Sequence, residues 1–421
     1  MEKTVFTDNG VAVHSYQNKN IGSFAISLFI RAGTMYEGAD ENGFTHFFEH
    51  VVFRNINACM DGKLYETLDL CGLYFNAATY VNYIEFTISG SKRHFEKAAE
   101  IICHVLSPLK IKAADILPEK KRIKAEIREN DEAGRQFFDS VAYEGSPLER
   151  SITGKCPDID RYGIRKLRTE IKKLLTKENL FFYVGGNFDD NGIDHLVSEI
   201  EKHSVFSGEK LLNRAPLPTD FAKRDCRIAV KNAQTTTVKL SFDISSEGHT
   251  VSELFCLGDA LFAGESCPMY RELSENTGLI YSYDDSVVCY GNFSVLSVTY
   301  EVRADKLIKS LDAVLHILAN AKKDLGKRLP YILPAYTDNI YTSLDDAESI
   351  ASDFGYYNHI LGCSYVDIEA RKREFENVSP DAITRLAYET FNPERAVIAI
   401  KGNKDKIDTE KIRKMCFNIL R

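Results

Sequence analysis

The chain opens with short apolar segments separated by polar turns. Segments 10–16 and 23–30 are rich in apolar and β-branched residues, and the sequence NKN at 18–20 between them is typical of a turn. Segment 73–89 has the same apolar, β-branched character. The pattern predicts strand structure in all three segments.

Later segments have helical character instead. Residues 44–53 form a dense apolar run, and residues 63–71 end at Gly72, a residue type suited to a helix C-cap. Residues 92–106 place their apolar side chains on one face of a helix. A charged segment from about 119 to 130 also has helical periodicity. We therefore expect strands and helices to alternate.

Two short patterns occur twice along the chain. A Gly-Leu pair begins a strand-like segment at residues 72–73 and again at 278–279. A polar tripeptide precedes an apolar strand at 177–179 and again at 393–395. Chance explains one such recurrence more readily than two at similar separations. The repeat favours two similar mixed α/β domains in tandem.

A change in composition separates the two copies. Gly208 and Pro216 interrupt the periodicity of a polar stretch in the middle of the chain. We expect an N-terminal domain at 1–205, a linker at 206–224 and a C-terminal domain at 225–421. A length of 421 residues is consistent with two or three domains.

Composition and charge narrow the class of protein. The 44% of hydrophobic and 27% of charged residues are typical of a globular chain. With 53 basic and 61 acidic residues the net charge is −8, which does not suit a nucleic-acid partner. No segment approaches the roughly 20 apolar residues of a membrane span, and the first residues resemble neither a signal peptide nor a mitochondrial presequence. Ten cysteines without a CxxC pair favour reduced thiols. We therefore expect a cytoplasmic protein with no nucleic-acid or membrane partner.

The most informative stretch of the sequence reads HFFEH at residues 46–50. On a helix, His46 and His50 are four residues apart and project from one face. Two imidazoles in this arrangement can bind a single Zn²⁺. Glu49 directly precedes the second histidine and borders the same face, where a general base acting on water would lie. The order of residues inverts the commoner HExxH motif.

The alternative is a helix in which these three residues make only structural contacts. The flanking sequence argues against it, because apolar residues surround the motif on nearly all sides and predict burial. A buried ionisable group is costly without a partner, and a metal ion supplies one. The motif therefore favours a zinc site.

A catalytic zinc usually has three protein ligands and one open position. Glu126 is a candidate for the third ligand because it borders the apolar stripe of Ile123 and Ile127. Glu119 lies two turns earlier on the same helix edge, a position that suits a carboxylate orienting a ligand or the water. Periodicity alone favours a solvated charged face for this helix, and spacing alone does not select Glu126 over Glu129.

These residues together resemble the pitrilysin/insulinase family of zinc metallopeptidases, and specifically its half-length bacterial members and the beta subunit of the mitochondrial processing peptidase. Segment 42–53, NGFTHFFEHVVF, is similar to the family block N-G-x-x-H-x-x-E-H-x-x-F. Glu126 lies at the family's distance from that block within a matching AEI context, and Glu119 matches its auxiliary glutamate. The resemblance implies zinc as the cofactor. It assigns the metal ligands His46, His50 and Glu126 and the catalytic residues Glu49 and Glu119.

The resemblance covers essentially the whole chain and implies its fold. That fold is of the α+β class, with two tandem homologous α/β-roll domains, each a mostly antiparallel sheet packed with helices. In half-length members the C-terminal domain of one subunit faces the active site of its partner. The resemblance also implies a chamber between facing domains that admits peptides and excludes folded proteins.

Substrate binding in this family is by addition of an extended peptide to a sheet edge. Asn76 and Ala77, in the sequence NAAT at 76–79, resemble the start of that edge strand. Tyr281, in the sequence GLIYS at 278–282, matches a tyrosine that helps to hold the substrate carbonyl. The implied substrate-binding residues are therefore Asn76, Ala77 and Tyr281.

Three aromatic residues near this edge allow two interpretations. Tyr80, Tyr83 and Phe86 could form a bulky apolar subsite, or they could be ordinary aromatic residues of a strand. The sequence favours neither interpretation.

The sequence departs from the family at one position. The family has an arginine seven residues before the tyrosine, whereas this chain has Ser274 there, with Arg271 one helical turn earlier. An intact zinc motif combined with an incomplete arginine–tyrosine pair suggests a division of labour. We expect a second half-length subunit to supply that pair, so that this chain is the catalytic subunit of a heterodimer.

The expected function is hydrolysis of peptides bound in extended form, with Glu49 as the general base. By analogy with unequal bacterial pairs, removal of leader segments from ribosomally made peptides is one role. A general cytosolic oligopeptidase acting as a homodimer is equally open. A non-catalytic scaffold subunit of a multi-subunit complex is the alternative from another class of protein, although such subunits typically lose zinc ligands.

Overall fold

The structure is a computed structural model that describes residues 1–203, 205–206, 208, 224–245, 248–290, 293–363 and 365–421. Within these residues the chain forms two compact units. The first unit comprises the described residues of Met1–Ala133, Arg150–Pro216 and Ile340–Arg371, and the second those of Gly134–Glu149, Leu217–Asn339 and Lys372–Arg421. Each unit therefore includes one segment from the other half of the sequence.

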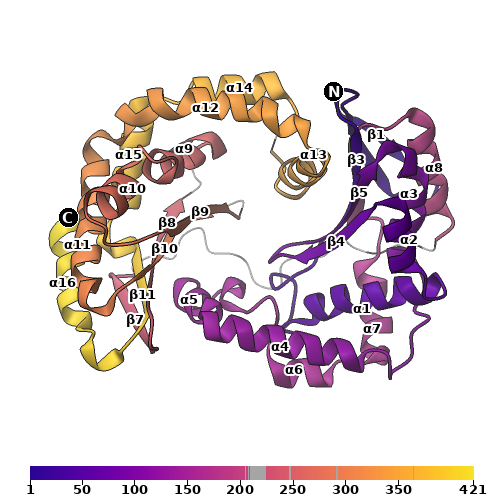
Figure 1. The fold of residues 1–421 in the computed structure, drawn as a ribbon, viewed down its shortest axis with the longest axis horizontal. Helices are drawn as coiled ribbons and strands as arrows, with labels where there is room; N and C mark the ends of the chain where they lie inside the picture. The colour runs from indigo at the N-terminus through magenta and orange to yellow at the C-terminus, as the bar shows by residue number, and fades with distance from the viewer. Residues whose placement is uncertain (204, 207, 209–223, 246–247, 291–292, 364) are drawn as a thin grey trace. The chain divides into compact units, whose positions relative to one another are not determined.

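The first unit contains a sheet with the strand order β1-β2-β6-β3-β5-β4 (Figure 1). Strands β2 and β6 run parallel, and the other neighbours are antiparallel. The strands are β1 (Lys3–Phe6), β2 (Ala12–Gln17), β3 (Ser23–Ile30), β4 (Tyr74–Thr79), β5 (Ile84–Ser91) and β6 (Leu180–Gly186).

Both faces of the first sheet are covered, which explains why β3 is apolar along nearly its whole length. Phe24, Ile26 and Leu28 belong to the main core of the unit. Ala25 and Phe29 alternate with them and belong to a second apolar cluster with α13 on the opposite face. Successive side chains of a strand point to opposite faces, so a strand covered on both sides needs apolar residues at every position.

Helices complete the first unit (Figure 1). They are α1 (Phe44–Cys59), α2 (Leu64–Cys71), α3 (Phe95–Cys103), α4 (Leu117–Ala133), α6 (Cys156–Arg161), α7 (Ile164–Leu174), α8 (Asp190–Glu201) and α13 (Ala347–Phe354), and α13 continues into the π-helical turn η8 (Gly355–Ile360). Helices α1 and α4 contact each other and carry the candidate site.

The second unit repeats the strand order of the first. Its sheet has the order β7-β11-β8-β10-β9, which corresponds to β2-β6-β3-β5-β4, and its single parallel pair, β7 with β11, corresponds to β2 with β6. The strands are β7 (Arg227–Asn232), β8 (Thr236–Ser245), β9 (Tyr283–Cys289), β10 (Phe293–Val302) and β11 (Ala396–Gly402). Strand β1 has no counterpart in the second sheet as described.

The helices of the second unit follow the same sequence order. They are α5 (Arg135–Ala142), α9 (Val251–Phe262), α10 (Pro268–Tyr270), the π-helical turn η4 (Arg271–Asn276), α11 (Leu307–Asp324), α15 (Pro380–Thr390) and α16 (Thr409–Leu420). Helices α12 (Leu329–Thr342) and α14 (Ile368–Glu376) contain the points at which the chain passes between the units. Helix α9 therefore corresponds to α1, since α9 follows β8 in the chain as α1 follows its counterpart β3.

The predicted fold class and the internal repeat are confirmed. The repeated sequence patterns precede corresponding strands, β4 with β9 and β6 with β11. The segment 73–89 forms two strands of a hairpin, β4 and β5, rather than one. Strand β1 was not predicted. All four of its residues are exposed, and its two apolar residues, Val5 and Phe6, are adjacent and do not alternate with polar ones.

The predicted domain limits stay a prediction, because most of the expected linker, 206–224, lies outside the described residues. Among the residues that the structure describes, no helix combines the length and apolarity needed to cross a membrane.

Candidate active site

The HFFEH motif lies near the start of α1, which runs six residues further than predicted, to Cys59. The helix begins after Gly43, whose φ of 81° is left-handed, and a Cβ at this position would lie 2.5 Å from the Cα of Gly154. The carboxylate of Glu37 accepts the backbone N–H groups of Gly43 at 2.9 Å and of Thr45 at 2.8 Å. A buried carboxylate from outside the helix therefore satisfies N–H groups that no helical residue can reach.

Three donor groups meet beside α1. The Nε2 atom of His46 lies 3.5 Å from Oε2 of Glu126, and Nε2 of His50 lies 3.4 Å from the same oxygen. The two imidazole rings are 4.7 Å apart, nearly edge to face. One donor atom from each residue lies within 4.8 Å of the other two. Helices α1 and α4 thus bring together residues that are far apart in the sequence.

These separations fit a zinc ion better than direct hydrogen bonds. An N–H···O bond is normally 2.7–3.2 Å long, whereas two ligands about 2.0–2.1 Å from a tetrahedral Zn²⁺ are about 3.3 Å apart. The side chains of His46 and His50 are each 11% exposed, and that of Glu126 is 35% exposed. Two buried imidazoles and a partly open carboxylate are a donor set that suits zinc.

Glu119 lies behind His50 and holds its ring. Its Oε2 is 3.2 Å from Nδ1 of His50, and its Oε1 accepts the Nε–H of Arg54 at 2.6 Å. The hydrogen bond with His50 is the main cause that lowers the pKa of Glu119, and Arg54 lowers it further. Glu119 is therefore a buried, ionised carboxylate that fixes the orientation of one candidate ligand.

The two histidines differ in their ease of protonation without a metal. Burial lowers the pKa of His46 to about 4, and the neighbouring His50 acts in the same direction. Burial alone would lower the pKa of His50 as well, but the hydrogen bond with Glu119 and the nearby carboxylate of Glu126 raise it to about 9. Of the two rings, that of His50 is therefore the more basic, because carboxylates flank it.

Glu49 points toward the edge strand of the sheet. The hydroxyl of Thr79, the last residue of β4, donates a hydrogen bond to Oε2 of Glu49. Burial raises the pKa of Glu49, and the Thr79 hydrogen bond partly opposes that rise. Asn76 and Ala77 lie on the same strand, which is at the end of the sheet order and pairs with β5. The candidate base and the expected substrate strand are therefore neighbours.

The aromatic residues near this edge do not form one apolar subsite. Tyr83 is buried and Phe86 is fully buried, in apolar clusters on opposite faces of the sheet. Tyr80 is 41% exposed and stacks on Tyr83 with a centroid distance of 4.3 Å. The interpretation as an ordinary strand aromatic is confirmed for Phe86, which is buried in β5. Tyr83 is also buried but directly precedes that strand.

Tyr281 belongs to the second unit and precedes β9. It is 95% exposed and lines a hollow together with Ser274 and Arg303. Arg271 lines a different cavity of about 840 Å³. Arg271, the arginine nearest in sequence to Ser274, therefore does not line the hollow that contains Tyr281.

Sequence reasoning missed three residues of this site. Thr79 lay within the quoted NAAT motif, and Arg54 follows His50 by four residues on the same helix face, so both had a signal in the sequence. Glu37 had none, because it lies in a polar segment before the helix and reaches the N–H groups only through the tertiary fold.

Comparisons with known proteins agree with this architecture. The family described as "Insulinase (Peptidase family M16)" matches residues 12–155, and that described as "Peptidase M16 inactive domain" matches residues 164–327. The uncharacterized zinc protease YmxG of Bacillus subtilis is 21% identical over 407 residues, which cover 95% of this chain and 98% of the relative.

More distant likenesses point the same way. The crystal structure of a protease from Helicobacter pylori has a TM-score of 0.80 at 20% identity and covers 96% of this chain and 99% of its own. Bovine cytochrome b-c1 complex subunit 1 is 24% identical over 207 residues, which cover 48% of this chain and 42% of the relative.

A duplicated α+β fold with an HxxEH helix beside a sheet edge defines an architecture of the inverted-zincin type. The chain belongs to peptidase family M16, the insulinase family. Its relatives include proteins named zinc proteases and a subunit of a respiratory complex.

Proposed function

We propose that this protein is a zinc-dependent endopeptidase that hydrolyses peptides bound in extended form. The observation that carries the proposal is the convergence of His46, His50 and Glu126, whose donor atoms lie within 4.8 Å of one another. Glu49 adjoins this cluster on the same helix and extends to the end of the edge strand. A base, a metal-ligand set and a peptide-binding edge in one place are what peptide hydrolysis requires.

In the proposed mechanism each residue has a defined task. His46, His50 and Glu126 would hold a zinc ion, which supplies Lewis-acid polarisation of the water and the scissile carbonyl. Glu49 accepts a proton from the attacking water and delivers it to the departing amine. Its raised pKa suits a group that must accept and then release a proton. Glu119 keeps the His50 ring in the orientation that binding requires.

The substrate would bind to the free edge of β4. Asn76 and Ala77 would form backbone hydrogen bonds with an extended peptide, which gives affinity for any sequence. The side-chain pattern of β4 alternates between more and less exposed positions at its start, as expected of a strand with an open face. Selectivity would come from pockets for alternate side chains of the peptide, with the exposed Tyr80 as one wall.

We further propose that a second half-length subunit completes the site, so that this chain is the catalytic subunit of a heterodimer. The support is the serine at 274 and the fact that Arg271 and Tyr281 line different hollows. Removal of leader segments from ribosomally made peptides is the role we propose for such a pair, in the cytoplasm. All ten cysteines, each of them in the described part of the chain, are thiols, which supports that compartment.

Two other functions remain candidates on specific observations. The likeness to bovine cytochrome b-c1 complex subunit 1 favours a scaffold subunit. The presence of Arg303 beside Tyr281 favours a self-sufficient homodimeric oligopeptidase, because it offers a guanidinium in the hollow where the arginine is missing. Bound zinc separates the scaffold from the enzymes, and activity of the chain alone separates the homodimer from the heterodimer.

Zinc content and peptide hydrolysis together test the proposal. We expect one zinc per chain at the proposed active site, loss of that zinc in Glu126→Ala, and retention in the control Glu129→Ala, whose side chain is exposed on the same helix. Glu49→Gln should retain the zinc. It should also lower turnover of a quenched fluorescent peptide by about 10³-fold, because only the proton-transfer group is lost.

Each outcome has a definite meaning. Retention of this zinc in Glu126→Ala would assign the third ligand elsewhere, and wild-type turnover by Glu49→Gln would remove the proposed base. Absence of this zinc from the wild-type chain would favour the scaffold function. Zinc binding without any hydrolysis, either alone or with the second half-length subunit, would contradict the proposed endopeptidase. Full turnover by the purified chain alone would contradict the heterodimer.

A further inference from the structure

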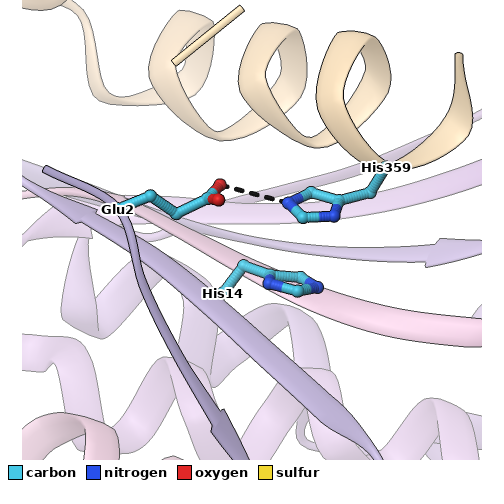
Figure 2. Close-up of side chains that lie close together, drawn as sticks. All are labelled: Glu2, His14 and His359. Carbon is cyan, nitrogen blue, oxygen red and sulfur yellow. Dashed lines mark hydrogen bonds and ion pairs between the residues drawn. The ribbon is translucent and has the colours of Figure 1, made fainter. Parts of the chain in front are cut away.

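A second group of metal-ligating side chains lies in the first unit, at the opposite end of the sheet from β4. Glu2 directly precedes β1, His14 lies on β2, and His359 lies on the π-helical turn η8 (Figure 2). One donor atom from each residue lies within 4.8 Å of the other two. We propose that Glu2, His14 and His359 form a second transition-metal site, of the zinc type, distinct from that of the HFFEH motif.

The contacts among the three residues are close. The Nε2 atom of His359 lies 3.1 Å from Oε1 of Glu2, the contact that Figure 2 marks with a dashed line. The rings of His14 and His359 stack with centroids 3.6 Å apart and planes inclined by 16°. The carboxylate and both rings lie at the junction between the β1 end of the sheet and η8 (Figure 2).

The donors are buried yet open to a cation. His14 is 9% exposed. The side chains of His359 and Glu2 are 22% and 21% exposed, which leaves a path for an ion. Neutral imidazole nitrogens and one carboxylate oxygen are the ligands that zinc prefers.

Surrounding groups hold the three ligands in place. The hydroxyl of Thr4, which faces His14 across the β1–β2 pair, lies 2.8 Å from Nδ1 of His14 and leaves Nε2 for a metal. The side-chain amide of Asn358 lies 3.4 Å from Oε1 of Glu2, and Arg31 donates to the backbone carbonyl of His359 at 2.6 Å. Outer partners of this kind fix the orientation of metal ligands.

An ion bound here would join three parts of the chain. It would tie the exposed strand β1 to β2 and both to η8, which comes from the segment Ile340–Arg371. The two rings would tilt from their parallel arrangement, because the lone pair of each nitrogen lies in the plane of its ring. Three protein ligands leave a fourth position for water. The second unit has no strand equivalent to β1 in the sheet as described, so the site would be specific to the first unit.

The test measures metal in a chain whose proposed active site has been emptied. In the full chain with His50→Ala and Glu126→Ala, we expect one zinc per chain in equilibrium dialysis. With cobalt(II) as the probe, we expect visible absorption bands of a tetrahedral site. Adding His14→Gln should abolish both signals, and adding Glu2→Gln should weaken binding at least about tenfold. The control His316→Gln, an exposed histidine of α11, should change neither.

Thermal unfolding gives an independent reading. Zinc should raise the Tm of the His50→Ala, Glu126→Ala chain and should not raise it once Glu2→Gln is added, because a ligand stabilises only a state that binds it. Glu2 precedes a wholly exposed strand, so this variant folds even if His14→Gln does not. The proposal is overturned if the His50→Ala, Glu126→Ala chain binds no metal and shows no Tm shift at zinc concentrations that saturate the wild-type chain. The three residues would then form only an imidazole–carboxylate hydrogen bond.

Discussion

The two units share a strand order but differ at the helix that follows the corresponding strands β3 and β8 in the chain. In the first unit this helix is α1, which carries His46, Glu49 and His50. In the second unit it is α9, which contains no histidine. The matching family description for much of the second half is an inactive domain. The chain therefore contains the same fold twice, once with the HFFEH motif and once without it.

The two helices begin in different ways. Helix α9 has a regular capping box, in which the hydroxyl of Thr250 accepts the N–H of Glu253 and the Glu253 carboxylate accepts the N–H of Thr250. Helix α1 begins at a left-handed glycine, and Glu37, in the loop six residues earlier, accepts the N–H groups of Gly43 and Thr45. The start of α9 is encoded locally, whereas the start of α1 depends on the tertiary fold.

They also meet the neighbouring edge strand differently. Glu49 of α1 accepts a hydrogen bond from Thr79 of β4, so a polar group lies between helix and strand. In the second unit α9 packs directly on β9, and a Cβ at Gly258 would lie 2.7 Å from Cγ2 of Val287. At this point of the second unit an apolar side chain of the strand therefore packs directly against the helix backbone.

The largest expected effect is at the start of α1. Gly43→Ala combines a left-handed φ with a Cβ 2.5 Å from the backbone of Gly154, so something must move. We expect a loss of about 3 kcal/mol or more in the free energy of unfolding, together with weaker zinc binding. Urea denaturation and zinc content measure the two effects.

Gly62→Ala is the matched control for this change. Gly62 also has a positive φ, of 85°, but no atom lies within 4 Å of its ideal Cβ. It should lose only about 1 kcal/mol and keep its zinc. Equal losses of stability in the two variants would show that the contact with Gly154 contributes nothing. The start of α1 would then depend on the tertiary fold no more than the start of α9 does.

A smaller effect is expected behind the metal ligands. Glu119→Gln removes the charge that holds Nδ1 of His50 and pairs with Arg54. We expect zinc affinity to fall about 10–100-fold, as is typical for partners of metal ligands. Competition with a chromogenic chelator measures the affinity. Unchanged affinity would mean that Glu119 serves only to anchor Arg54.

Local sequence was enough to predict the helices and strands that have a clear periodicity or turn sequence of their own. The dense apolar run of α1 and the spacing of its histidines placed two candidate ligands on one helix face. The repeated Gly-Leu and polar tripeptide patterns identified corresponding strands, β4 with β9 and β6 with β11. Periodicity and local turn chemistry depend on nearby residues alone, so they can be read before any tertiary contact is known.

Features that depend on distant contacts could not be predicted. Spacing did not choose Glu126 over Glu129, because only the packing of α4 against α1 decides which carboxylate faces the histidines. Glu37 gave no signal, and the cluster of Glu2, His14 and His359 joins residues more than 300 positions apart. The exposed strand β1 was missed for a related reason. Its four residues pair with β2 but lack the alternation of apolar and polar positions that marks a half-buried strand.

A third prediction concerns a buried carboxyl on α9. Burial raises the pKa of Asp259 to about 6, and the nearby Asp285 adds to that rise. A raised carboxyl pKa means that the folded state favours the protonated form. The wild-type chain should therefore lose stability as the pH rises from about 4 to about 6, and the loss should persist above that range.

Asp259→Asn removes this penalty. At pH 7.5 the variant should be more stable than wild type by about 1–2 kcal/mol, and at pH 4 the two should be similar. Asp284→Asn, at an exposed position on β9, is the control and should behave as wild type. Urea denaturation at both pH values gives the comparison. A variant less stable at neutral pH would mean that Asp259 is held by favourable contacts and not merely tolerated.

The smallest effect is expected at the start of α9, and it completes the comparison of the two helices. Thr250→Ala removes the hydroxyl that accepts the N–H of Glu253 at 3.1 Å, which should cost about 1 kcal/mol of stability. Thr250→Ser keeps the hydroxyl and should stay close to wild type. Zinc content should be the same in both, because the metal ligands belong to the other unit. Loss of zinc in Thr250→Ala would show that the second unit controls the metal site of the first unit.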